Sequence, residues 1–323
     1  DSREDDLVLC TFTGGASALT PALHPEIPLA DMQRLTCMLL ECGATIHEIN
    51  TLRKHLSRFS GGSLVRAAFP ATVLGLIVSD VVGDDLDVIA SGPTVPDPST
   101  FADCLRVVEH YGLRWKMPQS IWAHIEGGLQ GRTPETPKAD EPAFGRVRNV
   151  LVASVKQALE AAADEAARCG FVPRILTTAM SGEARRTAAQ LVAEARRAQA
   201  GLRPGDAPLC LLAGGETTVT IRGSGKGGRN QEMALAATLE LADDRGIDLI
   251  CVGTDGTDGP TDAAGGYAFS GDLARLRAIG LHPKESLDAN DSYPLLLKAG
   301  TLLRTGPTRT NVMDMAIMLV RPK

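Results

Sequence analysis

Four loops of this sequence combine glycine with hydroxyl, acidic or basic side chains, and each loop follows an apolar run. They span residues 13–18, 79–85, 222–232 and 253–265. Backbone N–H groups in a glycine-rich turn can point toward an anion, and a helix that follows adds the positive end of its dipole. The four loops therefore predict a small ligand that carries phosphate or carboxylate groups.

The first two loops differ in the charge that they carry. The first contains Gly14, Gly15 and Ser17, and a plain tight turn is the alternative interpretation of this segment. The second contains Asp80 and Asp84 after a buried strand, with no basic residue close in sequence. The repulsion between these carboxylates predicts a cationic partner, and Mg²⁺ is the usual one in phosphoryl transfer. A solvated acidic loop is the alternative.

The third loop places four glycines within residues 223–228, next to Lys226 and Arg229. It lacks the spacing of a P-loop, and it is not a G-x-G-x-x-G fingerprint placed after the first strand of a Rossmann unit. A helix that begins at Arg229 would hold Asn230 in its first turn, and the planar guanidinium of arginine suits a carboxylate or a phosphate. The pattern favours a loop that binds phosphate.

The fourth loop contains Asp255 and Asp258, which could bind a cation or accept the proton of a substrate hydroxyl. Residues 305–311 add hydroxyl groups and one more arginine. Four aspartates qualify as a catalytic base, namely Asp80, Asp84, Asp255 and Asp258. The sequence shows no Ser/His/Asp triad, its six histidines lack the spacing of metal ligands, and His124 is interpreted as an ordinary helix residue.

The elements that must position these loops alternate between strand and helix. Apolar runs predict strands over 7–12, 72–78, 149–153, 172–178, 209–213, 217–222, 247–253 and 313–320. Helices are expected over 32–42 with Asp31 as the N-cap, 44–58, 100–111 with Ser99 as the cap, 155–169, 183–200 and 229–242. Residues 127–147 are expected to form a surface excursion. Strands that alternate with helices indicate parallel βαβ units in a layered α/β domain.

A change of pattern near residue 205 predicts two domains. Residues 201–208 have the composition of a linker, and the strands expected at 209–213 and 217–222 are close enough for an antiparallel hairpin. We therefore expect one α/β domain over residues 1–205 and a smaller, mixed α/β domain over residues 206–323. A chain of 323 residues is long enough for two such cores.

Composition narrows the class of protein and its location. The net charge of −6 argues against a nucleic-acid partner. No apolar run has the length of a membrane span, and the first residues lack the order of a signal peptide. Seven cysteines without a CxxC pair argue against a structural zinc site and favour a reducing compartment. We expect a cytoplasmic enzyme.

Taken together, the motifs resemble those of the glycerate 2-kinase family whose C-terminal part is the MOFRL domain. The resemblance covers almost the whole chain and rests on residues 13–19, 44–57, 79–98, 212–232, 253–265 and 305–314. It implies a Rossmann-like, layered parallel-sheet N-terminal domain, a MOFRL domain, and an active site in the cleft between them. The implied reaction transfers the γ-phosphoryl group of ATP, with Mg²⁺, to the 2-hydroxyl of D-glycerate.

Residues of this chain take roles from the resemblance by motif. The catalytic residues implied are Arg229, Asp80 and Asp255, and the metal ligands are Asp80, Asp84 and Asp258. The residues that would bind substrate or phosphate are Gly14, Gly15, Ser17, Arg53, Lys54, Ser79, Gly215, Glu216, Lys226, Gly227, Gly228, Asn230, Thr310 and Asn311. The partners are D-glycerate and ATP, with no nucleic acid and no membrane, and a homodimer stays open.

The sequence departs from the family pattern at two places. Members of the family carry roughly a hundred residues before the strand that begins here at Leu7, and a Gly-Lys-Ala segment among them supplies an active-site lysine; we expect this part to be missing. Ser60 stands where the family has a lysine before paired glycines. Two alternatives remain, an NAD(P)H-dependent hydroxypyruvate reductase and a non-catalytic ligand-binding module. The position of the phosphorylated hydroxyl and the range of acceptor acids stay open.

Overall fold

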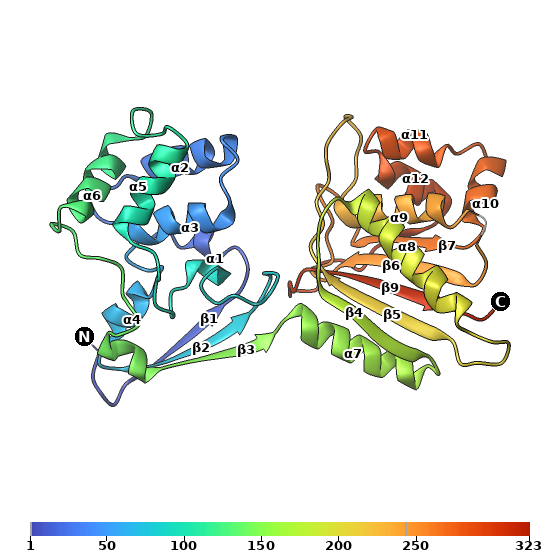
Figure 1. Cartoon of the computed structure of the whole chain (residues 1–323), viewed down its shortest axis with the longest axis horizontal. Helices are drawn as coiled ribbons and strands as arrows, with labels where there is room; N and C mark the ends of the chain where they lie inside the picture. The colour runs from blue at the N-terminus through green and yellow to red at the C-terminus, as the bar shows by residue number, and fades with distance from the viewer. Residues whose placement is uncertain (1, 243) are drawn as a thin grey trace. The chain divides into compact units, whose positions relative to one another are not determined.

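The computed structural model describes residues 2–242 and 244–323. The chain divides into two compact units (Figure 1). The first unit contains the chain up to Ser79 together with Asp84–Val152, and the second contains Asp80–Gly83 and Ala153–Lys323. Within the described residues, no helix is both long and apolar enough to cross a membrane.

The first unit combines a three-stranded sheet with a group of helices. The sheet has the order β1-β2-β3, and β1 pairs in parallel with β2 from Leu7 opposite Thr72 to Phe12 opposite Ile77. The elements are β1 (Leu7–Phe12), α1 (Ala16–Leu19), α2 (Leu29–Glu41), α3 (Ile46–His55), α4 (Ser63–Ala68), β2 (Thr72–Val78), η1 (Ile89–Ser91), α5 (Phe101–His110), α6 (Gln119–Leu129), η2 (Pro142–Arg146) and β3 (Val147–Ala153).

The core of this unit lies among α2, α3, α5 and α6, which contribute Leu35, Leu52, Val108 and Ile121, each fully buried. Helix α3 begins sharply because Thr45 and Glu48 form a capping box at its N-terminus. The expected N-caps differ elsewhere: α2 starts at Leu29 after Pro28, so Asp31 lies inside its first turn. Helix α5 is capped by Thr100 instead of Ser99.

The second unit contains a six-stranded sheet of order β4-β5-β9-β6-β7-β8. Strands β4 and β5 are parallel, and the other neighbouring pairs are antiparallel. Its elements are α7 (Val155–Arg168), β4 (Val172–Met180), α8 (Ala184–Ala200), β5 (Leu209–Gly215), α9 (Arg229–Glu240), β6 (Ile247–Gly253), β7 (Gly265–Phe269), α10 (Asp272–Ala278), α11 (Pro283–Asp288), α12 (Ser292–Ala299), β8 (Leu302–Leu303) and β9 (Asp314–Val320).

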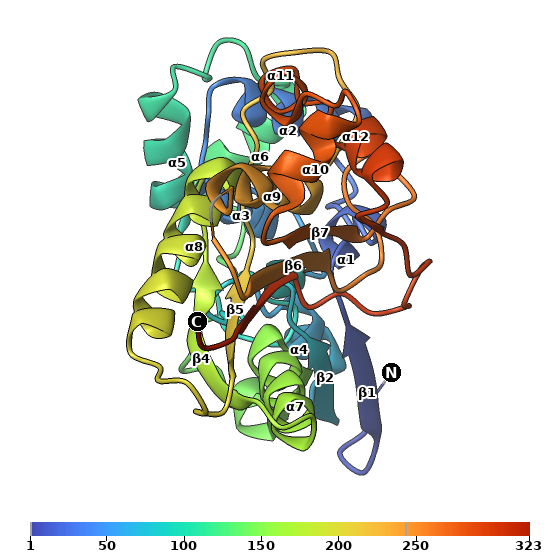
Figure 2. The ribbon, with the colours of Figure 1, turned by 90° about the vertical axis from the view of Figure 1, so that its right-hand side faces the viewer.

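Helices cover both faces of the large sheet, as Figures 1 and 2 show. Alternate residues of β5 explain this: Leu209 and Leu211 face a core shared with α8 and α9, whereas Cys210 and Leu212 face α7. A strand buried on both faces is apolar at every position, and the run LCLLAGG of β5 has this character. The layered α/β class with a mixed C-terminal sheet is confirmed.

The observed division into units differs from the expected boundary at residues 205 and 206. That boundary falls between α8 and β5, inside the second unit, because β4 pairs with β5 and because α8 packs on α9. The second unit therefore holds more of the chain than the first.

The prediction of a hairpin over residues 209–222 is wrong. Strand β5 is present, but both of its edges are already paired, with β4 on one side and β9 on the other. Residues 217–222 therefore have no free edge to join and form a loop, in which Ile221 is 81% exposed. No strand or helix was predicted between the fourth loop and β9, where the structure has β7, β8 and the helices α10, α11 and α12.

Candidate active site

Arg229 is the first residue of α9, and two carboxylates hold its side chain. Its Nε lies 2.5 Å from Asp314 Oδ2 and its Nη2 lies 3.1 Å from Asp314 Oδ1, which is a two-pronged contact. Its Nη1 lies 2.5 Å from Glu216 Oε1. These bonds occupy three of the five N–H groups of a guanidinium, so two can point at another acceptor.

Acidic groups surround this arginine. Burial raises the pKa of Glu216, Arg229 opposes the rise, and the charges of Asp314 and Asp80 add to it. Burial also raises the pKa of Asp80. Burial alone would lower the pKa of Arg229, but hydrogen bonding to Asp314 and the nearby carboxylates outweigh it and raise that pKa. The structure thus brings Arg229, Glu216 and Asp80 of the prediction into one electrostatic environment.

Asp258 caps the N-terminus of α9. Its carboxylate accepts hydrogen bonds from the backbone N–H groups of Asn230 at 3.1 Å and Gln231 at 2.9 Å. The side chains of Asn230 and Gln231 donate to it as well, at 3.3 and 2.9 Å. Asp258 is only 3% exposed, and burial raises its pKa although these donors oppose the rise. Its oxygens are therefore already engaged within the protein, and the predicted metal role has to compete with these bonds.

The glycines of the third loop allow its backbone to pack closely against neighbouring segments. A side chain at Gly227 would place its Cβ 2.2 Å from Ser292 Oγ, and one at Gly228 would place it 2.3 Å from Asp258 Cγ. Lys226 is held beside the same segment, because its Nζ lies 4.5 Å from the centre of the Tyr293 ring. Packing against residues 289–293 and Asp258 thus explains much of the glycine content that suggested a phosphate cradle.

The fourth loop and residues 305–311 are tied together. Thr308 Oγ1 donates to the Thr254 carbonyl at 2.6 Å, and Val312 N donates to Thr254 Oγ1 at 2.8 Å. Asp255 accepts from the N–H and the hydroxyl of Thr257, each at 2.9 Å. Thr310 is exposed, and Asn311 accepts from the backbone N–H of Met313.

In the first unit, Ser17 and Arg53 line one pocket of about 620 Å³. Ser17 Oγ lies 2.8 Å from Ser91 Oγ, and Asn50 Oδ1 accepts from Ser91 at 3.1 Å and from Arg53 at 3.2 Å. Within the described residues, no carboxylate forms an ion pair with Arg53, and burial lowers its pKa. A partly buried cation whose observed partner is a neutral amide is well suited to bind an anion.

Lys54 is engaged differently from its neighbour Arg53. It is buried, forms an ion pair with Asp87, and has Asp97 Oδ1 at 3.6 Å. The two carboxylates neutralise the charge of Lys54 inside the unit. The predicted phosphate contact of Lys54 would have to replace one of these partners.

The acidic loop spreads over both units. Ser79 is fully buried at the end of the first segment, Asp80 belongs to the second unit, and Asp84 belongs to the first. Oδ1 of Asp84 is buried and has no hydrogen-bond partner among the described residues. An orphaned carboxylate oxygen of this kind fits a cation.

In the first loop, Gly14 and Gly15 precede α1, and Gly15 adopts a φ of 82°.

Three residues that the sequence analysis did not select complete these clusters: Asp314, Asn50 and Ser91. The sequence held a signal for Asp314, because it is the one charged residue of β9 and stands at the start of an otherwise apolar strand. The structure buries it, with 1% of its surface exposed. No sequence signal pointed to Asn50 and Ser91, since they are distant in sequence and meet only in the folded unit.

Two family models match the chain. The model described as "Domain of unknown function (DUF4147)" matches residues 1–126, and the one described as "MOFRL family" matches residues 209–314. The MOFRL match begins at the first residue of β5 and contains Glu216, Arg229 and Asp258.

Known proteins match over nearly the full chain. The chain is 46% identical to "Glycerate 2-kinase" of Pyrococcus horikoshii over 323 residues, which is 100% of this chain and 72% of that protein. It is 44% identical to "Putative hydroxypyruvate reductase" of Agrobacterium vitis, covering 98% of this chain and 70% of that protein. The crystal structure of a glycerate kinase from Thermotoga maritima superposes with a TM-score of 0.89 at 43% identity, covering 99% of this chain and 74% of that one.

The expected absence of roughly a hundred N-terminal residues is not confirmed by these comparisons. The first family model already matches from residue 1, and the relatives align with the whole of the chain.

Proposed function

Because the chain belongs to the glycerate kinase family with a MOFRL domain, we propose that it transfers the γ-phosphoryl group of ATP to the 2-hydroxyl of D-glycerate. The observation that carries this assignment is the match to glycerate kinases over 99–100% of the chain at 43–46% identity. The family implies ATP as the donor, and the glycerate 2-kinase of Pyrococcus horikoshii supports the 2-position. Phosphoryl transfer requires mainly positioning and charge neutralisation, which the clusters around Arg229 and Arg53 can supply.

Arg229 contacts the transferred phosphoryl group in this proposal. Asp314 fixes the plane of its guanidinium through two bonds, so the two remaining N–H groups have a defined direction. A fixed pair of donors can stabilise the charge of the transition state without reorganising. Glu216 positions the other edge of the same group.

Arg53 and Ser17 bind the acid substrate. Glycerate offers a carboxylate and two hydroxyls, and the pocket around Ser17 offers a cation beside a chain of hydroxyl and amide groups. The guanidinium would pair with the carboxylate and Ser17 would hydrogen-bond to a hydroxyl.

Asp84 is proposed as a ligand of Mg²⁺, because its Oδ1 is buried and has no hydrogen-bond partner among the described residues. Asp80 is kept as a proposed ligand on the sequence motif alone. When bound with ATP, the ion supplies charge neutralisation on the phosphate oxygens. Asp84 is the proposed ligand with the clearest support. The oxygens of Asp258 are already occupied by donors from α9.

Asp80 is the proposed general base for the substrate hydroxyl. Burial raises its pKa, and a base whose pKa is nearer to neutrality accepts a proton more readily. Asp255, the other candidate, uses its two oxygens to hold Thr257.

We also propose that the other residues selected from the sequence contact the phosphate groups or the substrate, through their backbone or their side chains. These residues are Gly14, Gly15, Lys54, Ser79, Gly215, Lys226, Gly227, Gly228, Asn230, Thr310 and Asn311. The proposal includes a cytoplasmic location, which the seven free cysteines support. The oligomeric state is not part of the proposal, and a homodimer is compatible with it.

The test is to incubate the protein with ATP, Mg²⁺ and D-glycerate, to follow ADP release, and to identify the product by phosphorus NMR. We expect 2-phosphoglycerate, and omission of either glycerate or Mg²⁺ should abolish ADP release. Formation of 3-phosphoglycerate would refute the proposed position, and absence of any phosphorylated acid would refute the activity.

A hydroxypyruvate reductase is the second candidate, because the relative from Agrobacterium vitis carries that name. It predicts that hydroxypyruvate oxidises NADH or NADPH, which absorbance measures directly. Residues 223–228 have the spacing G-x-G-x-x-G, but they do not follow directly on a strand, since β5 ends at Gly215, and their glycines pack against residues 289–292 and Asp258, which is an argument against a dinucleotide site. Oxidation of the nicotinamide by hydroxypyruvate, together with no glycerate-dependent release of ADP from ATP, would favour the reductase.

A further inference from the structure

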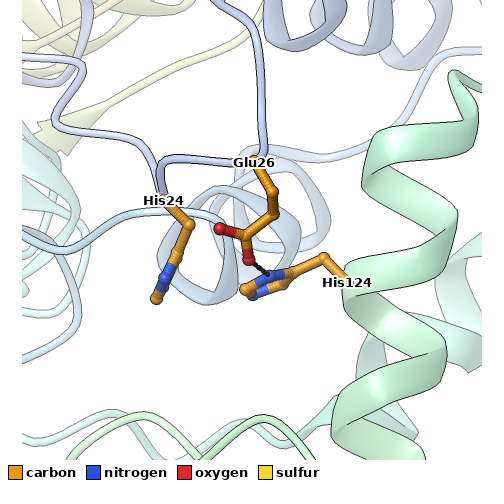
Figure 3. A group of neighbouring side chains, drawn as sticks. All are labelled: His24, Glu26 and His124. Atoms are coloured by element: carbon orange, nitrogen blue, oxygen red, sulfur yellow. Dashed lines mark hydrogen bonds and ion pairs between the residues drawn. The ribbon is translucent and has the colours of Figure 1, made fainter.

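Three side chains of the first unit, His24, Glu26 and His124, converge outside the clusters described so far. Their possible ligand atoms all lie within 4.8 Å of one another. His24 and Glu26 come from the segment between α1 and α2, and His124 comes from α6, as Figure 3 shows. Because about a hundred residues separate the two histidines in sequence, spacing could not reveal this group.

The backbone holds the two loop residues in place. The N–H of His24 donates to the Leu56 carbonyl at 3.2 Å, and that of Arg58 donates to the Ala22 carbonyl at 2.7 Å. A turn in which the N–H of Ile27 donates to the His24 carbonyl at 2.9 Å brings His24 and Glu26 to the same side of the segment. The geometry of the group is therefore fixed by the fold and not only by the three side chains.

His124 has the arrangement that is typical of a metal ligand. Its Nε2 lies 2.9 Å from the carbonyl oxygen of His55, which can only accept, so Nε2 carries a proton. Its Nδ1 lies 2.8 Å from Glu26 Oε1, a contact that an ion bound to both atoms would have to replace. Histidines that bind metals usually donate the other ring N–H to a carbonyl or carboxylate, which fixes the tautomer and aims the free nitrogen.

The other two side chains lie beside His124. The centre of the His24 ring is 4.4 Å from that of the His124 ring, and the carboxylate of Glu26 reaches the same group, so a second imidazole and a carboxylate lie within reach of one ion. His24 also lines a cavity of about 220 Å³, which gives an ion a path from solvent.

We propose that His24, Glu26 and His124 bind one divalent transition-metal ion of the Zn²⁺ type. The ion would link the segment before α2 to helix α6. Two imidazole nitrogens and one carboxylate are a donor set that Zn²⁺ uses in proteins, with a remaining position open to water. Mg²⁺ prefers oxygen ligands only, so this site differs in kind from the acidic loop. The rival interpretation is an ion pair between protonated His124 and Glu26, with His24 as a bystander.

The test uses the tag-free full chain after treatment with a chelator, titrated with Zn²⁺ by calorimetry and with Co²⁺ by visible absorption. We expect one ion per chain, Co²⁺ bands without thiolate charge transfer, and no competition from Mg²⁺. His24→Ala and Glu26→Gln should each weaken binding at least about tenfold. His47→Ala, an exposed histidine on α3, is the matched control and should bind as the wild type does.

Circular dichroism of each variant verifies that the fold is intact. His24→Ala and Glu26→Gln are the decisive variants, because both residues lie on the surface segment and His124 is buried. Unchanged affinity in both variants, or the absence of stoichiometric binding, would overturn the site. A thiolate charge-transfer band would instead place the ion on cysteine and would also overturn it. None of these measurements uses kinase activity, so the proposed function can fail or succeed independently.

Discussion

At the scale of residues, one arginine and its acidic partners form the most specific cluster. Arg229 is fixed by Asp314 and Glu216 and stands at the N-terminus of α9, whose dipole also favours an anion. Asp314 is almost fully buried, so the pair has a structural role as well as the proposed catalytic one.

Replacing Arg229 should therefore affect both activity and stability. We expect Arg229→Ala to lose about 2–4 kcal/mol of transition-state stabilisation in kcat/KM, as removal of a fixed electrostatic donor does. It should also lower the free energy of unfolding by about 1–3 kcal/mol, because Asp314 is left buried without its partner. Steady-state kinetics and urea unfolding measure the two effects.

Arg229→Lys separates these effects. It keeps the charge near Asp314 but loses the planar fork, so it should recover more stability than activity. Equal recovery of both would indicate that Arg229 acts only through the fold.

Arg53 should determine the affinity for the acid substrate. Arg53→Gln keeps a polar group beside Asn50 but removes the cation, so we expect KM for D-glycerate to rise by at least about tenfold while KM for ATP stays within about twofold. Arg34→Gln, an exposed arginine on α2, is the control. A rise in KM for ATP alone would assign Arg53 to the nucleotide instead.

At the scale of elements, two helices carry the key residues, and the groups that cap their N-termini differ in kind. Helix α3 carries Arg53 and Lys54 and begins with the Thr45 and Glu48 capping box. Helix α9 carries Arg229 and is capped by Asp258 from a distant loop. One cap is local in sequence, and the other joins two of the glycine-rich loops.

The capping box of α3 predicts a pH dependence of stability. Hydrogen bonds from Thr45 lower the pKa of Glu48 below its ordinary value of 4.5. A lowered folded pKa means that this stabilisation is present above pH 4.5 and is lost as pH falls through the folded pKa. Glu48→Gln should therefore be less stable than the wild type by about 1 kcal/mol or less at pH 7, since the site is largely solvated.

Urea unfolding at a series of pH values measures this difference, which should shrink toward zero in acid. Glu41→Gln, at the exposed end of α2, is the matched control. A difference that stays constant between pH 7 and the acid limb would contradict the assigned origin of the shift.

The cap of α9 predicts the outcome of replacing Asp258. Asp258→Ala removes the acceptor of two backbone and two side-chain donors, so we expect a loss of about 1–3 kcal/mol in the free energy of unfolding. Asp258→Asn, which keeps one acceptor oxygen, should lose less. If Asp258 were instead a metal ligand, Asp258→Asn would raise the Mg²⁺ concentration needed for half-maximal activity while stability stayed near that of the wild type.

At the scale of the whole molecule, two separate hydrophobic cores underlie the division into units. Leu35 lies in the core of α2, α3, α5 and α6, and Leu235 lies in the core between α9 and the large sheet. Both side chains are fully buried. Units with cores of their own can unfold as separate cooperative blocks.

We expect calorimetry to resolve two unfolding transitions and two matched cavity variants to act on different ones. Leu35→Ala and Leu235→Ala should each cost about 2–5 kcal/mol, since a buried leucine loses its contacts and leaves a cavity. Each variant should lower the midpoint of one transition and leave the other nearly unchanged. A single transition that both variants lower equally would show that the chain unfolds as one block.

The sequence by itself determined the elements whose patterns are local. The apolar runs of β1, β2, β6 and β9 and the helical periods of α7 and α8 were predicted close to their observed bounds, because burial periodicity is written along the chain. The glycine-rich loops identified Arg229 and the family resemblance, since motif chemistry is also local.

Only the tertiary structure decided which residues meet. The pairing of β5 with β4 and β9 excluded the expected hairpin, and β9 follows β5 only after about a hundred residues of chain. Asp314 joined Arg229, and Asn50 and Ser91 joined Arg53 and Ser17, because the fold brings distant backbone segments together. The convergence of His24 with His124 has the same origin. Such contacts arise from packing between elements, and no spacing along one chain encodes them in a form that can be read directly.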